Sequence, residues 1–353
     1  MNDLSIQFVQ QVFKKYYESV NSFGIIKVMK RELAFAPFSR QGMIRHTSFP
    51  SMESLVAYVR ENTPQHFYYS SAYYENPSAT MENKGWQGAD LVFDIDGDHI
   101  PGSEKMSYGE MLATVKLEVT KLLNILTDDL GVGKDNLEIV FSGSRGYHVH
   151  VYSLFDDLES QERREIVDYI SGRCIQSSNQ LFPKSRWAER LLLMKKGLLN
   201  ILSEKGEWRE KLESRTGETT GKMTKKEIRE SDYIERNARK LAIELYASKI
   251  DEPVTIDIHR LIRTPDSLHG KTGLVVKHVN YDNLEEFDPL RETIPEGNEI
   301  EVNVLVSKGG TVEIGERRIE VKEGRAKVPT YAAVFMILRG TAELVKEGNE
   351  IFN

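Results

Sequence analysis

Two aspartates, Asp94 and Asp96, stand two residues apart in a segment whose composition favours a β-strand. The segment covers residues 89–96, is rich in apolar side chains, and is followed by Gly97. Because side chains two apart on a strand point to the same face, the two carboxylates are expected to point together. Paired carboxylates at the end of a buried strand need a cation, and hard oxygen ligands favour Mg²⁺ or Mn²⁺. The alternative is that both residues simply end the strand in a polar turn.

A second group of reactive side chains lies in the stretch 141–150, which reads FSGSRGYHVH. Its two glycines let a backbone approach a ligand, while Ser142, Arg145 and His148 offer hydrogen-bond donors. Arginine and histidine together suit an anion such as a triphosphate. The alternative for Arg145 is a solvated turn residue. Because His148 and His150 share a strand face, either they are a metal-binding pair or His150 is a strand residue, packed or at the surface.

A third stretch, 251–273, combines acids with basic residues. It contains a further carboxylate, Asp251 or Asp257, and donors that seek phosphate, among them Arg263 and His269. Each of the three stretches is ambiguous alone. Together they contain metal ligands and phosphate clamps, and this combination predicts that the protein handles nucleotides.

The three stretches, in their order and wide spacing, resemble the catalytic small subunit of archaeal and eukaryotic DNA primases. The resemblance covers Arg31 to Gly273. It implies a template-dependent nucleotidyltransferase that makes short primers de novo on single-stranded DNA by a two-metal mechanism. The alternatives are a repair-type primase-polymerase that extends or fills existing ends, and a replication scaffold without catalytic activity.

The resemblance also implies roles for individual residues. Asp94, Asp96 and Asp251 would hold two divalent ions and form the catalytic acids, with Asp257 as the alternative third ligand. It further points to Arg45 as a residue that approaches the nucleotide. The residues implied for binding the incoming nucleotide are Ser142, Arg145, His148, Arg263 and His269.

The expected cofactor is Mg²⁺ or Mn²⁺, and zinc is not expected. Related primases commonly carry a Cys/His knuckle between the aspartate pair and the Gly-Arg-His loop, whereas this segment contains no cysteine. The partners implied are a single-stranded DNA template, NTPs or dNTPs, and a large subunit with an iron–sulfur cluster that forms a heterodimer with this chain.

The elements that must position these residues alternate between helical and strand patterns, which predicts an α+β fold. Apolar spacing predicts helices over 4–20, 51–60 and 107–130, the last with a capping box of Ser107 and Glu110. Two β-like runs around 143–146 predict a hairpin. The primase resemblance implies a mixed α/β core with an element similar to an RNA-recognition motif.

Three segments are predicted along the chain. Residues 1–154 form the first part of the catalytic core, 155–249 a charged helical insertion, and 250–353 the second part of the core. The last segment ends in a tail, 276–353, in which alternating residues predict several short strands.

Composition limits the class of protein. The chain has 353 residues, a net charge of −7 and one cysteine, Cys174, so it cannot form an internal disulfide. No apolar run approaches the ~20 residues that cross a bilayer, and the N-terminus lacks the pattern of a signal peptide. A cytoplasmic protein with no membrane association is therefore expected. The acidic balance places any nucleic-acid contact on local basic patches.

Overall fold

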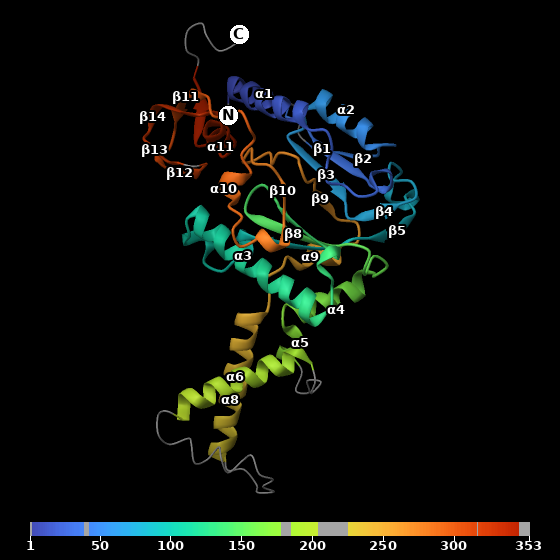
Figure 1. Cartoon of the computed structure of the whole chain (residues 1–353), viewed down its shortest axis with the longest axis vertical. Coiled ribbons are helices and arrows are strands. Elements are labelled where there is room, and N and C mark those ends of the chain that lie inside the picture. The colour runs from blue at the N-terminus through green and yellow to red at the C-terminus, as the bar shows by residue number, and fades with distance from the viewer. Residues whose placement is uncertain (1, 39–41, 178–184, 204–224, 316, 346–353) are drawn as a thin grey trace. The chain divides into compact units, whose positions relative to one another are not determined.

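The chain folds as an α+β protein, as predicted (Figure 1). The computed structural model describes residues 2–38, 42–177, 185–203, 225–315 and 317–345. Parts of the predicted helical insertion, at 178–184 and 204–224, and the last residues of the predicted tail lie outside these ranges. In the described part of the chain, no helix has both the length and the apolar character needed to cross a membrane.

The described residues divide into two compact units. The first contains residues 1–119, 132–163 and 250–353, and the second contains 120–131 and 164–249. The second unit thus includes residues 120–131, which the sequence places in the first part of the core. The predicted segment borders at 154 and 249 stay a prediction, because compactness alone does not define a domain.

One antiparallel sheet of the first unit carries the predicted aspartates and the Gly-Arg-His loop. Its strands, in spatial order, are β10 (Lys277–Val279), β7 (Leu137–Phe141), β8 (Gly146–Val151) and β6 (Leu91–Asp96). The predicted hairpin is present, with Phe141 opposite Tyr147. In the β6–β8 register Asp94 lies opposite His148, so the acid and the histidine are cross-strand neighbours.

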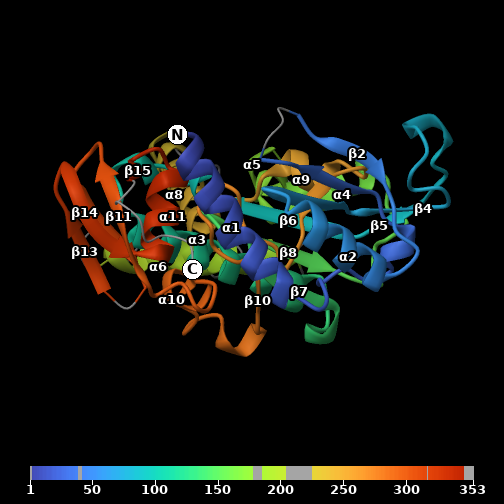
Figure 2. The same ribbon diagram turned by 90° about the horizontal axis from the view of Figure 1, so that it is seen from above.

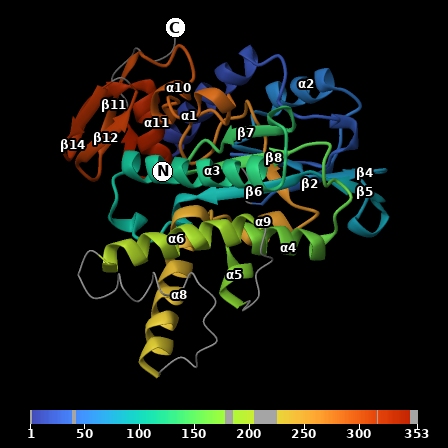
Figure 3. The ribbon, with the colours of Figure 1, turned by 60° about the horizontal axis from the view of Figure 1, so that its bottom comes forward.

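Helix α3 (Tyr108–Asn124) follows β6 in the chain (Figure 3). Its start is the predicted capping box, in which the Ser107 amide donates to Glu110 Oε2 and the Glu110 amide donates to Ser107 Oγ. A single turn of π-helix, Ile125–Asp129, extends it, and Gly131 in the left-handed conformation ends it.

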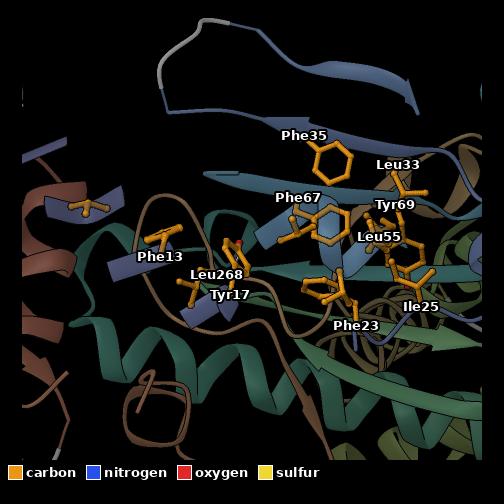
Figure 4. Close-up of a cluster of buried hydrophobic side chains, with 14 of the residues drawn as sticks. Phe13, Tyr17, Phe23, Ile25, Leu33, Phe35, Leu55, Phe67, Tyr69 and Leu268 are labelled. Atoms are coloured by element: carbon orange, nitrogen blue, oxygen red, sulfur yellow. Dashed lines mark hydrogen bonds between the residues drawn. The ribbon is translucent and has the colours of Figure 1, made fainter. Parts of the chain in front are cut away.

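A second antiparallel sheet of the first unit has the order β2 (Ile44–Thr47), β1 (Leu33–Ala36), β3 (His66–Ser70) and β9 (Leu261–Arg263). Helices α1 (Asp3–Ser19) and α2 (Met52–Asn62) pack against it through a largely aromatic core (Figure 4). The rings of Phe35 and Phe67 stack in this core, with centroids 4.8 Å apart. The core therefore fixes β9, which lies within the third predicted stretch, and β3, the strand that pairs with it.

Strands form in the predicted tail, together with a helix that the alternating pattern does not predict. They are β11 (Glu301–Val306), β12 (Gly310–Ile314), β13 (Arg317–Val321), β14 (Gly324–Pro329) and β15 (Ala342–Leu344). The helix is α11 (Thr330–Leu338), which is apolar nearly all round and almost wholly buried. Figure 2 shows α11 and β15 near the first turns of α1, and Leu344 joins the aromatic core. The tail thus belongs to the first unit.

Shorter elements complete the first unit. They are β4 (Ala72–Tyr74), β5 (Trp86–Ala89), α9 (Glu252–Ile256) and α10 (Pro289–Glu292).

The second unit is mainly helical. Helix α4 (Ser160–Ile170) leads into it, and α5 (Arg173–Ser177), α6 (Arg186–Ser203) and α8 (Lys225–Tyr246) follow. Trp187 packs in its small core against Ala242, and its indole N–H donates to the Tyr169 carbonyl at 3.0 Å. Asp129 is buried there and paired with Arg190 at 2.6 Å.

Candidate active site

Asp94 and Asp96 lie on one face of β6, as the two-residue spacing predicts. The alternate residues Leu91, Phe93 and Ile95 are fully buried on the other face. Burial raises the pKa of Asp94 to about 7, and the negative charges of Asp96 and Asp251 act in the same direction. The positive side chains near Asp94, Arg260 and Arg263, thus do not fully offset burial and the negative charges of Asp96 and Asp251.

Asp251 stands beside Asp94, although the two are far apart in the chain. Its backbone N–H donates to the Asp94 carbonyl at 2.7 Å. Asp251 immediately precedes α9, but its side chain makes no capping bond to that helix. Asp257, the alternative third acid, is exposed at the other end of α9 and accepts from the His259 amide at 2.9 Å.

The loop between β7 and β8 presents Ser142 and Arg145. The Ser142 hydroxyl oxygen accepts from the Gly146 amide at 3.3 Å, which leaves its hydrogen available for a ligand. Arg145 forms a two-pronged ion pair with Asp98, and its Nε lies 3.7 Å from Asp96 Oδ1. The Arg145 guanidinium is thus held by Asp98, which follows the two aspartates in the chain.

Two glycines allow this loop to approach its neighbours. Gly143 has a φ of +80°, and a side chain there would begin 2.7 Å from the Cβ of His269. A Cβ at Gly146 would stand 2.5 Å from the Ile95 carbonyl oxygen of β6. The loop can therefore lie against both the aspartate strand and the His269 turn only because these positions lack side chains.

Gly146→Ala is expected to separate β8 from β6. Overpacking of this kind costs about 1–3 kcal/mol of the free energy of unfolding, and it would also displace Arg145 from the aspartates. The measurement is urea unfolding beside nucleotide incorporation. The matched control is Gly197→Ala in α6, where nothing lies within 4 Å of the added Cβ and alanine favours the helix. Equal stability of the two variants would contradict the close-approach explanation.

His148 is buried beside Asp94, with its Nε2 3.6 Å from Asp94 Oδ1. Burial holds its pKa well below the usual value, so the ring is neutral at pH 7. His150 is also buried, and its ring stacks with Tyr69 and with Tyr152. Of the two alternatives that the sequence left for His150, this position fits the packed strand residue.

Arg263 and His269 come from β9 and the turn that follows it. Arg263 lies 3.0 Å from His66 Nδ1 and 3.2 Å from the Tyr68 hydroxyl, over whose ring it also stacks. The His269 Nδ1 accepts from the Lys271 amide at 3.2 Å, and burial lowers its pKa well below the usual value. In that neutral state Nε2 carries the hydrogen, so His269 can donate one hydrogen bond.

These side chains line one cavity of about 350 Å³. Of the eight predicted site residues, all but Asp251 line it, and Asp251 is joined to Asp94 by a backbone hydrogen bond. We call this space the catalytic cavity. Its lining further includes His66, Tyr68, Ser144, Arg260 and Lys271.

A family model described as DNA primase small subunit matches residues 93–281. The DNA primase small subunit PriS of Thermoplasma volcanium is 37% identical, over 97% of this chain and 98% of the relative. That of Archaeoglobus fulgidus is 42% identical, over 95% and 97%.

The chain belongs to the DNA primase small subunit family. The predicted resemblance and the predicted kind of enzyme, a DNA primase, are therefore confirmed. Among solved structures, the polymerase domain of Mycobacterium tuberculosis Ligase D in complex with DNA aligns with a TM-score of 0.42 and 14% identity. The alignment covers 81% of this chain and 85% of the Ligase D chain.

Membership in this primase family implies the use of a divalent metal ion in general, and the words small subunit imply a partner subunit. The residues present fit such an ion through the chemistry of their donors. Asp94, Asp96 and Asp251 offer carboxylate oxygens, and the pKa of Asp94 is raised first by burial and then by the charges of Asp96 and Asp251, which a cation would neutralise. In the part of the chain that the structure describes, no three His, Cys, Asp or Glu side chains already converge as a finished metal site.

The structure of this primase subunit places one predicted residue outside the catalytic cavity and adds two residues that the sequence does not predict. Arg45 does not line the catalytic cavity, because its guanidinium pairs with Glu32 at 3.1 Å. His66 and Tyr68 line the cavity, yet they were not predicted, because β3 reads as an ordinary aromatic strand. Only the pairing of β3 with β9, which places Tyr68 opposite Arg263, reveals them.

Proposed function

We propose that this primase small subunit joins nucleotides de novo on a single-stranded DNA template, with divalent ions held by Asp94, Asp96 and Asp251. One observation carries the proposal: three acids adjoin a cavity whose other walls carry arginine, lysine and histidine. Acids beside phosphate-binding cations are the arrangement that nucleotidyl transfer requires. Asp251 is preferred to Asp257 because its charge acts on Asp94, whereas Asp257 is exposed at the far end of α9.

The cationic wall would hold the triphosphate of the incoming nucleotide. The Ser142 hydroxyl and the His269 Nε2–H are available as neutral donors, and Arg263 adds a half-buried positive charge fixed by His66 and Tyr68. Donors fixed in this way lose little entropy when the ligand binds and stabilise charge that develops during transfer. Lys271 is exposed at the rim and can reach a terminal phosphate.

Arg145 would bind the triphosphate after loosening its contact with Asp98. Its ion pair is partly exposed, so the exchange of one anion for another costs little. His148, neutral and next to Asp94, would orient that carboxylate rather than contribute charge. Bound divalent ions would lower the pKa of the attacking 3′-hydroxyl and neutralise the leaving pyrophosphate.

The experiment is product formation by the purified chain on single-stranded DNA with labelled nucleotides and Mg²⁺ or Mn²⁺, without primer. Primer-length products that disappear in Asp94→Ala would support the proposal. Products that form only on a supplied primer would instead favour extension or gap filling, or a need for the large subunit, and adding that subunit separates these two. A chain that binds no nucleotide in the presence of metal would be a scaffold.

Removal of divalent ions is expected to stop synthesis completely and reversibly. After chelation and dialysis, Mg²⁺ or Mn²⁺ should restore incorporation, because carboxylate ligands suit these hard ions. Zn²⁺ should not, since the chain has one cysteine, Cys174, and none near the aspartates. Incorporation that persists in excess chelator would contradict a metal-dependent reaction.

A further inference from the structure

A second cavity, of about 470 Å³, is lined by residues from the start of α3, the β12–β13 hairpin and α11. Tyr108 contributes from α3, Lys308 and Arg318 from the hairpin region, and Phe335 and Arg339 from α11 and its C-terminal end. All belong to the first compact unit. None of these residues has a role in the proposed reaction. We call this space the tail cavity.

The tail cavity is positively charged in a chain whose net charge is −7. Lys308, Arg318 and Arg339 line it together with a single acid, Glu313, whose Oε1 lies 3.9 Å from Arg318 Nε. Among the described residues, Lys308 and Arg339 have no carboxylate within ion-pair distance, and both are exposed. Clustered, unpaired cations on an acidic protein are a local site for a polyanion.

The tail cavity also contains an exposed arginine set over two aromatic rings that are tilted to each other by 54°. The Arg339 guanidinium lies over the Tyr108 ring, 5.1 Å from its centroid, and over the Phe335 ring at 4.9 Å. The two rings are themselves 5.9 Å apart. Bases of single-stranded nucleic acid stack on aromatic rings and on arginine planes without regard to sequence. Cations and a stacking surface in one cavity therefore suit a single strand better than a simple anion.

The tail cavity adjoins the catalytic cavity through Tyr108. The Tyr108 hydroxyl donates to the carbonyl oxygen of Ser144 at 2.7 Å, and Ser144 lines the catalytic cavity next to Arg145. Tyr108 therefore lines the tail cavity and is hydrogen-bonded to a residue that lines the catalytic cavity. A strand that leaves the catalytic cavity on this side would meet Tyr108 and then the cations of the hairpin.

We propose that the tail cavity binds the single-stranded template where it leaves the catalytic cavity, with Lys308 and Arg318 on its phosphates and Arg339 against a base. The proposal rests on the proposed primase function. A strand is favoured over a free nucleoside triphosphate, because a triphosphate is normally bound together with a metal held by carboxylates. The one acid here, Glu313, faces Arg318 instead.

The test compares the double variant Lys308→Ala/Arg318→Ala with the wild-type chain in binding to fluorescent oligo(dT). The lengths should cover about 4–16 nucleotides, the range of single-strand site sizes. Affinity for the shortest strands should change least, because they can bind near the catalytic cavity without reaching Lys308 and Arg318. For the longest strands, loss of two phosphate contacts should reduce the slope of log affinity against log salt by about 1.4. The matched control is Lys322→Ala/Arg325→Ala, which removes two exposed cations outside the tail cavity.

Equal affinity and equal salt slope for the wild type and the Lys308/Arg318 variant at every length would overturn the proposal. So would an effect as large in the Lys322/Arg325 control, since binding would then depend on overall charge. A variant that binds strands normally but needs more nucleoside triphosphate would show a nucleotide site instead. Binding is measured without catalysis, so these results are independent of whether Asp94→Ala loses synthesis.

Discussion

Asp94→Asn is expected to lower primer synthesis by about 10³-fold or more and, without divalent ions, to make the protein more stable. Asparagine keeps the shape of the side chain but loses the charge that binds a cation. The same charge is unfavourable in the folded protein without metal, because burial, Asp96 and Asp251 raise the pKa of Asp94 to about 7. The Asp94 carboxylate is therefore needed for synthesis but lowers the stability of the metal-free protein.

The sign of the pH dependence follows from that raised pKa. The folded state binds a proton at Asp94 more tightly than the unfolded chain, whose aspartate has its ordinary pKa. As pH rises from about 4 to about 7, this group therefore lowers the stability of the wild type. Asp94→Asn should gain most over the wild type at about pH 8 and little below about pH 4. Thermal unfolding in chelator at both values measures the difference.

Asp257→Asn is the matched control, because it removes a carboxylate from the other end of α9. It should retain synthesis, whereas Asp251→Asn should lose it as Asp94→Asn does. If Asp257→Asn were inactive and Asp251→Asn active, the third ligand would be Asp257. If Asp94→Asn retained synthesis, Asp94 would not be a metal ligand.

The sequence predicts those parts of the site that depend on local geometry. The two-residue spacing of Asp94 and Asp96 is enough to place them on one strand face, and the glycines at 143 and 146 are enough to predict a close loop. Local signals also predict the capping box at Ser107. In each case the residues that decide the geometry lie within a few positions of one another.

Features that depend on sheet pairing are beyond the reach of a single sequence. Tyr68 enters the catalytic cavity because β3 pairs with β9, nearly 200 positions further along the chain. The Asp98 partner of Arg145 depends on how two loops meet. Arg45 shows the same limit, because its partner Glu32 becomes visible only once β1 and β2 are paired. Short-range patterns in the sequence do not specify such long-range contacts.

The second large effect is expected at Arg31, which is completely buried in the first unit. Its Nη1 donates to the carbonyls of Ser70 and Ser71 at the end of β3, at 2.9 and 2.6 Å. Its Nη2 pairs with Asp90 Oδ2, just before β6, at 2.6 Å. Arg31 thus connects the strand that carries Tyr68 to the strand that carries Asp94.

Arg31→Met is therefore expected to lower the free energy of unfolding by about 3–5 kcal/mol, because it leaves the buried Asp90 charge without its ion-pair partner and, among the described residues, with only the Tyr73 hydroxyl as a donor. The measurement is urea unfolding beside Lys134→Met, which breaks an exposed pair with Asp282 and should change little. The double variant Arg31→Met/Asp90→Asn tests the cause. It removes the orphaned charge and should recover part of the loss. A double variant as unstable as Arg31→Met would mean that the lost carbonyl contacts, and not the unpaired charge, account for the effect.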